Sequence, residues 1–419
     1  MRISSALYFQ TGLNSINKQQ SDLVHTFQQL GSGRRMVTPA DDPLAAAQTI
    51  TLAQSKSMNQ RFAENRHVAL RQLGEEENVL MSMIPQVNGA KTRLLEAANG
   101  TLSDADRTIL AGVFEEMRDS LANLANAKDA SGQYIFSGSK GNTAPFVIDP
   151  ATNKYVYKGD QVDRNIQADQ TRQIPASDHG VDLLLRATPG STIFLTSGHA
   201  NNTGTGVIGG VNITDITLAA NAADATITVE DNGDLTVIWQ GINGAPDVET
   251  KTIPAAEFST SGVVDLGNGV TVQLSGEPKA GDTFRLDNAQ AKTGSDDLNI
   301  LNTLEEVIAA LKQPVDANPA AKAQMQNVLN GAMQKIDMTY DNILTVRASV
   351  GARMNEIEAI DASGQLQSLH LASEISRLED LDYYTASTQL ELRTSALEAA
   401  ALAFKKIQST NLFAINARG

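Results

Sequence analysis

The fold is decided by a heptad pattern in residues 9–33, FQTGLNSINKQQSDLVHTFQQLGSG. Apolar residues recur in this stretch at alternating intervals of four and three, and Gln20 is the one polar member of the series. Such spacing aligns the apolar side chains along one side of an α-helix, as in a coiled coil. The helix is predicted to end at Gly31-Ser32-Gly33, because glycine readily adopts the left-handed conformation that follows a last helical turn.

The C-terminal part of the chain carries the same pattern over a longer distance. Residues 325–360 keep the spacing of four and three and predict the longest helix of the chain. A further helix follows, with apolar residues that recur on one heptad position. The residues that this last helix places at seam spacing are Tyr383, Ala386, Leu390, Arg393, Leu397, Ala400, Phe404 and Ile407.

The apolar stripes at the two ends of the chain predict an assembly interface. A single helix of about 25 residues with one apolar stripe is only marginally stable in water, so it needs another apolar surface to pack against. A bundle within one chain explains the periodicity as well, but the terminal position of the stripes favours contact between copies. The predicted interface residues are Phe9, Leu13, Ile16, Leu23, Phe27, Leu30, Leu390, Leu397, Phe404 and Ile407.

Strands are predicted in the middle of the chain, where the composition shifts toward Gly, Thr, Val, Asp and Pro. Asn232-Gly233 and Asn268-Gly269 each lie between alternating apolar residues, which is the pattern of a tight β-hairpin. Short strands are also predicted at residues 134–136 and 155–157.

These patterns together predict an α + β protein of several domains. Helices from both ends of the chain form a long antiparallel coiled-coil bundle, and a β-rich outer region is inserted between them. The predicted parts are a terminal helix and loop (1–42), the first part of the bundle (43–132), a β-rich outer part (133–188), an inserted sandwich (189–292), the second part of the bundle (293–375) and a last terminal helix (376–419).

Local signals set the predicted limits of the helices. Asp42 caps a helix that starts at Pro43, whose missing N–H costs nothing in a first turn. Pro85 lies inside this helix and predicts a bend, because proline removes one backbone hydrogen bond. Ser103 caps a further helix, which is expected to end near Ser131-Gly132.

Charge, cysteine content and hydropathy exclude several classes of protein. The formal charge of −15 argues against a nucleic-acid partner, because phosphate repels a negative chain. The absence of cysteine excludes disulfides, thiol nucleophiles and Cys-type zinc sites. No run reaches the roughly 18 apolar residues of a membrane span, and the first residues lack the apolar core of a cleavable signal peptide. We therefore expect no membrane insertion, and export by another route if the protein leaves the cell.

The sequence predicts no catalytic, cofactor or metal site, and hence no enzyme. The five histidines share no spacing that would bring metal ligands together. Residues 204–209 match the dinucleotide fingerprint GxGxxG in letters, but a strand is predicted after them, where the fingerprint needs a helix. Glu75-Glu76-Glu77 is interpreted as a solvated helix face. An enzyme or carbohydrate-binding module in residues 189–292 is an alternative, although that region has one tryptophan, Trp239, and no obvious carboxylate pair.

Several short motifs resemble the flagellin superfamily of bacterial axial proteins. In the N-terminal arm they are Leu30-Gly31-Ser32-Gly33-Arg34-Arg35, Ala40-Asp41-Asp42-Pro43 and Asn99-Gly100-Thr101. In the C-terminal arm they are Ala403-Phe404-Lys405-Lys406-Ile407 and Leu412-Phe413. The resemblance covers about residues 1–190 and 295–413.

Within this family the chain looks most like the subunits that join hook and filament, because residues 132–138 and Pro145-Phe146 resemble the entry into their outer domain. The resemblance implies a self-assembling structural subunit that lies between the other hook-associated junction protein and flagellin. It also implies export in the unfolded state through the flagellar type III export apparatus, with help from an export chaperone. The absence of cysteine agrees with such a route. The nearest alternative within the family is flagellin itself.

Overall fold

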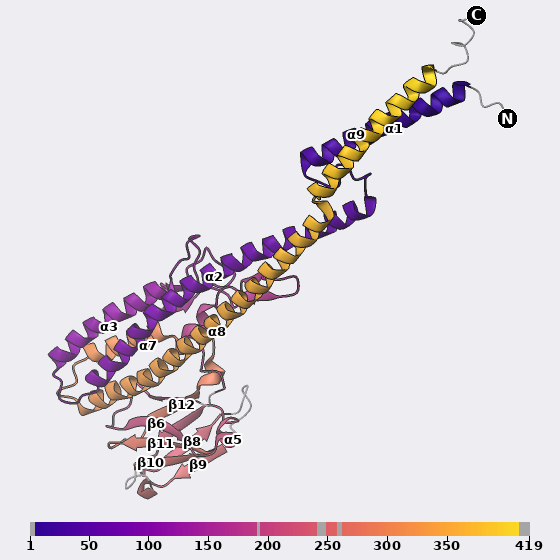
Figure 1. The fold of residues 1–419 in the computed structure, drawn as a ribbon. Helices are drawn as coiled ribbons and strands as arrows, with labels where there is room; N and C mark the ends of the chain where they lie inside the picture. Colours follow the sequence, from indigo (N-terminus) through magenta and orange to yellow (C-terminus); the bar gives the residue numbers. More distant parts are fainter. Residues whose placement is uncertain (1–4, 191–192, 241–248, 258–261, 410–419) are drawn as a thin grey trace, which may run out of the picture. The chain divides into compact units, whose positions relative to one another are not determined.

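The computed structural model describes residues 5–190, 193–240, 249–257 and 262–409. The chain forms two compact units. The terminal unit comprises residues 1–64 and 359–419, and the central unit comprises residues 65–358. Two long helices, α2 (Pro43–Ala97) and α8 (Pro319–Glu379), each contribute one part to both units (Figure 1).

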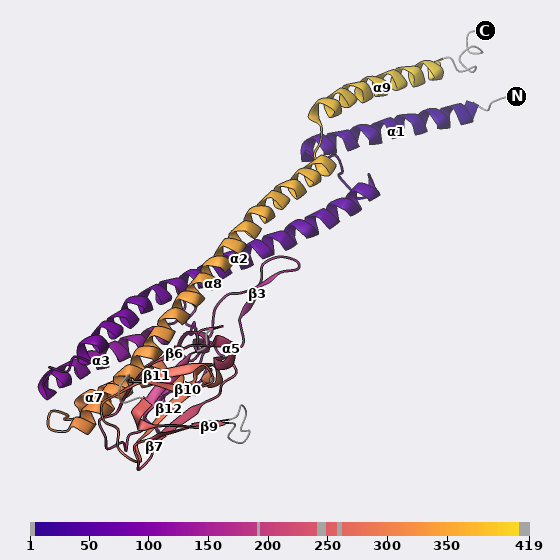
Figure 2. The ribbon, with the colours of Figure 1, turned by 90° about the horizontal axis from the view of Figure 1, so that it is seen from below.

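In the terminal unit, helix α1 (Ser5–Ser32) packs along helix α9 (Tyr383–Ser409), as Figures 1 and 2 both show. The helices are antiparallel, because Phe9 meets Phe404 at one end and Gly33 meets Tyr383 at the other. The predicted end of α1 is confirmed, and Gly33 has the positive φ of 70° expected after a last helical turn. The N-cap of α2 is confirmed as well, since Asp42 Oδ1 accepts a hydrogen bond of 3.0 Å from the Ala45 N–H.

In the central unit, the shorter helices α3 (Asp104–Ala125) and α7 (Ile300–Lys312) pack against each other. Helix α2 approaches α3 at Gly89, and α8 forms the ion pairs Lys91–Asp337 with α2 and Lys335–Glu306 with α7. The cap of α3 is confirmed: Ser103 and Asp106 form a reciprocal capping box. The predicted end near residues 131–132 was wrong, because α3 ends at Ala125. Asn126 leaves the helix and binds both the N–H and the C=O of Phe146 through its side-chain amide.

Both long helices run without interruption past residues that weaken a helix. Helix α2 continues through Pro85, so the proline does not divide it. Helix α8 likewise continues through Gly364. Continuous apolar rows bury the inner faces of these helices in the central unit, and packing of this kind outweighs the cost of a single unfavourable residue. Fully buried members of the rows are Leu73, Leu80 and Leu94 on α2 and Ile336, Ile343 and Val350 on α8.

The inserted region forms a β-sandwich of two antiparallel sheets. The strands of the larger sheet are β5 (Phe194–Gly198), β12 (Thr283–Asn288), β7 (Ala225–Val229), β8 (Leu235–Trp239) and β9 (Glu249–Ile253), in that spatial order. Those of the smaller sheet are β10 (Val263–Gly267), β11 (Val270–Ser275) and β6 (Val207–Ile213). Both sheets share one apolar core, which contains Trp239 and Phe284, and a short helix, α5 (Ile216–Ala219), lies nearby in sequence after β6. The two predicted Asn-Gly hairpins are confirmed as β7–β8 and β10–β11.

A smaller β-rich segment precedes the sandwich. It contains the pairs β1 (Phe146–Ile148) with β2 (Tyr155–Tyr157) and β3 (Asn165–Gln167) with β4 (Gln173–Pro175), followed by helix α4 (Gly180–Leu184). Two short 3₁₀ helices, η2 (Ala289–Lys292) and η3 (Asp296–Leu298), lead from β12 to α7.

The strand predicted at residues 155–157 is confirmed as β2, but the one predicted at 134–136 was wrong. Tyr134 forms only an isolated antiparallel bridge with Lys128, and Ile135 and Phe136 lie in a turn. The Tyr134 N–H bonds to Gly141 O and the Ile135 N–H bonds to Ala127 O. The two compact units meet at residues 64/65 and 358/359, inside the long helices. The predicted six-part division, with limits at 42/43 and 375/376, therefore stays a prediction.

The acidic run at residues 75–77 is not the solvated face that the sequence indicated. Segments distant in sequence cover it: Ala130 donates its N–H to Glu75, and Arg347 forms an ion pair of 2.6 Å with Glu77. Glu76 is fully buried and accepts the Asp178 N–H at 3.1 Å. Burial, reinforced by the negative charge of Asp178, raises the pKa of the Glu76 carboxyl well above its usual value, although Arg353 opposes the shift.

Substitution Glu76→Gln is expected to stabilise the central unit near neutral pH. Folding raises the pKa of this carboxyl, so its contribution to the free energy of unfolding falls as pH increases. The fall begins at about pH 4.5, where the unfolded group ionises, and continues up to the higher pKa of the folded state. The glutamine keeps an acceptor for the Asp178 N–H and never ionises. Urea unfolding at pH 4.5 and 7.5 should show an advantage of the variant that grows with pH. Glu75→Gln, on a half-buried neighbour, is the control, and an E76Q variant that is weaker at both pH values would contradict the explanation.

Candidate assembly interface

The α1–α9 pair is held by a seam of side chains that touch at close range. The ring centroids of Phe9 and Phe404 lie 5.1 Å apart. Gly12 allows this approach, because a Cβ at that position would lie 2.9 Å from Phe404 Cδ2. Farther along, the Arg393 guanidinium donates a hydrogen bond of 2.6 Å to Asp22 O. The seam is therefore apolar at the Phe9 end and partly polar near its middle.

The predicted interface residues that the structure describes lie on these two helices, but the pair buries none of them completely. Ile16, Leu23, Leu30, Leu390, Leu397 and Phe404 are half-buried. Phe9, Leu13 and Phe27 are exposed, and Phe27 keeps 56% of its surface accessible. The side chain of Ile407 falls outside the described part of α9. Two helices alone thus leave much of the seam in contact with water.

A second set of apolar side chains lies outside the seam. Leu392 and Leu402 on α9 are 65% and 67% exposed, and Leu7 and Val24 on α1 are similarly open. Burial of such side chains contributes roughly 25 cal/mol per Å² of apolar surface, and this stabilisation is missing while they face water. An apolar surface that extends around a helix pair is typical of a protein–protein contact.

Two fully buried positions in the pair were not assigned to the interface from the sequence. Thr26 is 1% exposed, and Ala386 is 4% exposed. The Thr26 hydroxyl donates to Asp22 O, the same carbonyl that Arg393 binds. Thr26 lies three residues after Leu23 and four before Leu30, so helical spacing alone was enough to include it. The apolar heptad pattern does not include Thr26, because threonine is polar and the neighbouring Phe27 occupies the heptad position.

The loop between α1 and α2 is fixed to the turn between α8 and α9. The Leu381 N–H binds Gly33 O at 3.0 Å, and the Arg35 N–H binds Glu379 O at 2.7 Å. The Arg35 side chain also reaches Leu378 O, at 3.1 Å. These bonds join the C-terminal end of α1 to the N-terminal end of α9, so the two helices enter the seam in a fixed register.

Asp41 organises the remainder of this loop. Its Oδ2 accepts the N–H groups of Val37 and Thr38, each at 2.8 Å, and His25 Nε2 lies 3.1 Å from its Oδ1. The Thr38 N–H makes the largest contribution to lowering the pKa of Asp41 to about 2, and Val37, the Thr38 hydroxyl and His25 lower it further.

The two units differ in net charge. The terminal unit has 11 lysines and arginines against 11 aspartates and glutamates, whereas the central unit has 22 against 37. The whole formal charge of −15 therefore belongs to the central unit. A neutral surface suits contact between identical copies, because like charges do not accumulate where the copies meet.

Neither a metal cluster nor a membrane-spanning helix is found among the described residues. Among them, no three His, Asp or Glu side chains lie where they could hold a metal ion together. Within the same ranges, no helix has the length and apolar character needed to cross a membrane. The GxGxxG match is a structural loop that leads into β6: Asp282 accepts the Gly204 N–H at 3.0 Å, and a Cβ on Gly204 would lie 2.4 Å from that carboxylate.

Comparison with known proteins places both helical arms in one family. The model of the bacterial flagellin N-terminal helical region matches residues 3–141, and that of the C-terminal helical region matches residues 333–414. Together they cover more than half of the chain. Flagellar hook-associated protein 3 of Escherichia coli is 26% identical over 416 residues, which are 99% of this chain and 100% of that protein.

Solved structures show the same similarity. Hook-associated protein 3 from Legionella pneumophila is 26% identical, with a TM-score of 0.65 over 78% of this chain and 98% of that one. The flagellar junction protein FlgL from the same organism is 25% identical, with a TM-score of 0.61 over 80% of this chain and 100% of that one.

Replacement of exposed seam residues is expected to leave the isolated chain folded. Phe27→Ala should lower the free energy of unfolding by about 1 kcal/mol or less, because the ring is largely in water before the change. Leu73→Ala, in the buried row of α2, should lower it by about 2–5 kcal/mol. Urea unfolding of dilute protein measures both. Equal losses would mean that the α1–α9 pair buries Phe27 without help from another copy.

Acid is expected to loosen the α1–α2 loop. A carboxylate whose folded pKa is lowered stabilises the fold above its unfolded pKa, near 4, and loses that contribution as pH falls toward 2. The amide resonance of Thr38, in protein labelled on threonine, should titrate with a midpoint near pH 2. The same resonance in Asp41→Asn should be insensitive to pH in this range. A midpoint near 4 in the unsubstituted protein would show that the Asp41 bonds do not form in solution.

Proposed function

Because this chain belongs to the flagellin superfamily, we propose that it is a structural subunit of the bacterial flagellum that forms the junction layer between hook and filament. Full-length similarity to hook-associated protein 3 supports this role within the family. The single structural observation that carries it is the apolar surface of the α1–α9 pair, which one chain leaves open.

In the proposed assembly, the terminal units of neighbouring copies cover one another's open faces. Phe9, Leu13 and Phe27 become buried there against apolar side chains of a neighbouring copy, and so do the exposed leucines of α9. The neutrality of the terminal unit favours such close contact. The ten predicted interface residues form the core of this contact in our proposal. The layer would join a bending hook to a stiffer filament.

The proposed partners are further copies of this chain, the other hook-associated junction protein and flagellin. Before assembly, an export chaperone covers the terminal helices, and the flagellar type III apparatus exports the chain unfolded. The absence of cysteine supports this route, since no disulfide would form in the chain before it unfolds. The protein would act at the cell exterior, by assembly rather than by catalysis.

Flagellin is the second candidate, because the two matching family models are those of the flagellin terminal regions. Location separates the two roles. Immunogold labelling of detached flagella should place this chain only at the proximal end of the filament. Label along the whole filament would identify a filament subunit instead, and a deletion strain with normal, attached filaments would contradict the junction role.

A charge in the seam is expected to abolish assembly while leaving the central unit folded. Leu397→Asp places a carboxylate among half-buried apolar side chains, where each copy would have to desolvate it on assembly. Cells that carry this variant should keep hooks, lose attached filaments and release flagellin into the medium. Glu398→Gln, at the adjacent exposed position, is the control and should behave as the unsubstituted protein. Normal swimming of the Leu397→Asp strain would refute the proposed interface.

A further inference from the structure

Helix α8 presents a row of side-chain amides to the sandwich within the central unit. The row, here called the amide ladder, consists of Gln324, Asn327, Asn330 and Gln334. Intervals of three and four residues place its members on one face of the helix. The ladder has no apolar periodicity, so neither the heptad pattern nor hydropathy marks it in the sequence.

The ladder binds strand backbone. Asn327 accepts the Ile208 N–H at 2.8 Å and donates to Gly206 O at 3.1 Å, as a residue of a neighbouring strand would. Asn330 donates to Ile208 O at 3.0 Å. Gln334 accepts the Thr196 N–H at 3.0 Å. Gln324 completes the row with bonds to Ala200 O and Asn202 O.

The backbone groups that Asn330 and Gln334 bind, and the Ile208 N–H that Asn327 binds, belong to open sheet edges, whereas Gln324 binds the loop between β5 and β6. Strand β5 is the first strand of the larger sheet, and β6 is the last strand of the smaller one. Each has a strand partner on one side only, and the other side faces α8. Unpaired edge groups form a template for pairing with another chain, so folded proteins protect them.

Nothing in the strands themselves supplies this protection. Between Arg186 and Asp215 lie 28 residues without a single Asp, Glu, Lys or Arg, and both edge strands fall in this stretch. Charged residues are a common means of keeping an edge strand from pairing with another molecule. The protection of β5 and β6 must therefore come from outside the strands.

Two glycines allow α8 to approach the strands closely enough. A Cβ on Gly331 of α8 would lie 3.0 Å from Thr196 O. A Cβ on Gly198 of β5 would lie 2.7 Å from the Asn327 side-chain nitrogen. Glycine at both positions lets short amide side chains reach the backbone.

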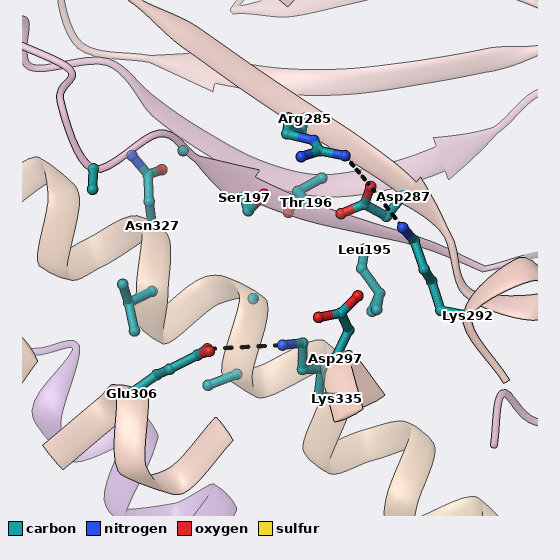
Figure 3. A pocket seen from close by; sticks show the side chains of 15 residues that line it. Leu195, Thr196, Ser197, Arg285, Asp287, Lys292, Asp297, Glu306, Asn327 and Lys335 are labelled. Atoms are coloured by element: carbon teal, nitrogen blue, oxygen red, sulfur yellow. Dashed lines mark hydrogen bonds and ion pairs between the residues drawn. The ribbon is translucent and has the colours of Figure 1, made fainter. Parts of the chain in front are cut away.

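Charges contribute little to this attachment. A cavity of about 470 Å³ lies beside the ladder, and Figure 3 shows charged side chains on both of its walls. On the helix wall Lys335 pairs with Glu306, and on the strand wall Asp287 pairs with Arg285 and Lys292. Among the described residues that line the cavity, no ion pair joins one wall to the other. The ladder is thus the main polar link on this side of the sandwich.

We propose that the amide ladder of α8 is an edge cap, and that its removal turns β5 and β6 into a docking surface for the same edge of a second copy. Amides suit this role because they satisfy both donors and acceptors of a strand edge and bring no net charge into a partly buried site. The occupant follows from the geometry, since an identical uncharged edge pairs antiparallel with itself by backbone bonds alone.

The test is the double variant Asn327→Ala/Gln334→Ala in the full chain. Hydrogen exchange at the Thr196 and Ile208 amides should become at least tenfold faster in dilute protein. At higher concentration, sedimentation should show a mass at least twice that of the unsubstituted chain. Introducing Leu397→Asp into both proteins excludes assembly through α1 and α9, and the mass difference should persist. Trp239, the single tryptophan, lies in the sandwich core and reports by its fluorescence whether the sandwich stays folded.

Two further variants make the result specific. Gln326→Ala removes an amide on the same helix that lies outside the ladder, and it should change neither exchange nor mass. Adding Ser197→Lys to the double variant places a charge on the exposed side of β5 and should restore the monomer. Unchanged exchange, or faster exchange with no increase in mass, would overturn the proposal. If the double variant loses the Trp239 signal, Gln334→Ala alone, which uncaps only Thr196, must show the same two changes.

Discussion

The structure depends on one constraint: two helices packed side by side cannot bury an apolar surface that extends around them both. The α1–α9 seam has close contacts at Phe9, Gly12 and Phe404, and yet Phe27, Leu392 and Leu402 face water. In the central unit, α2, α3, α7 and α8 carry apolar rows that are fully buried, although single side chains such as Leu95 and Ile109 are exposed there as well. The α1–α9 pair thus leaves open an apolar surface that further copies of the chain would cover in the assembly proposed above.

Much of the fold was predictable because its signals are local. Alternating four–three spacing defined the terminal helices, Ser103 and Asp42 defined two helix starts, and Asn-Gly pairs defined two hairpins. The failures have a common physical cause. The environment of Glu76 is set by Asp178, about a hundred residues away, and the end of α3 is set by a bond from Asn126 to Phe146. A sequence pattern records a residue's neighbours in the chain and carries no information about such partners.

The candidate interface was predictable to a similar extent and for the same reason. Heptad spacing selected side chains on the correct helices, because an apolar stripe is visible in the sequence. It did not select Thr26, which is buried in the seam because its hydroxyl donates a hydrogen bond to Asp22 O of the same helix and is thereby satisfied. The amide ladder was invisible in the same way, since Asn and Gln at helical spacing look like an ordinary solvated face. In this protein, amides repeatedly hold β-rich segments to helices, as Asn126, Asn302 and Asn327 do.

The uneven charge of the two units has a consequence for how copies behave in a crowd. Contacts through the neutral terminal units bring no like charges together, so each added copy meets no electrostatic penalty at the point of attachment. Every copy nevertheless adds a net charge of −15 in its central unit, and this charge repels the central units of other copies over a Debye length of about 8 Å at physiological salt. In the proposed assembly, this distribution of charge keeps free copies dispersed through their central units and leaves attachment through the terminal units, which carry no net charge, as the contact with the lowest electrostatic cost.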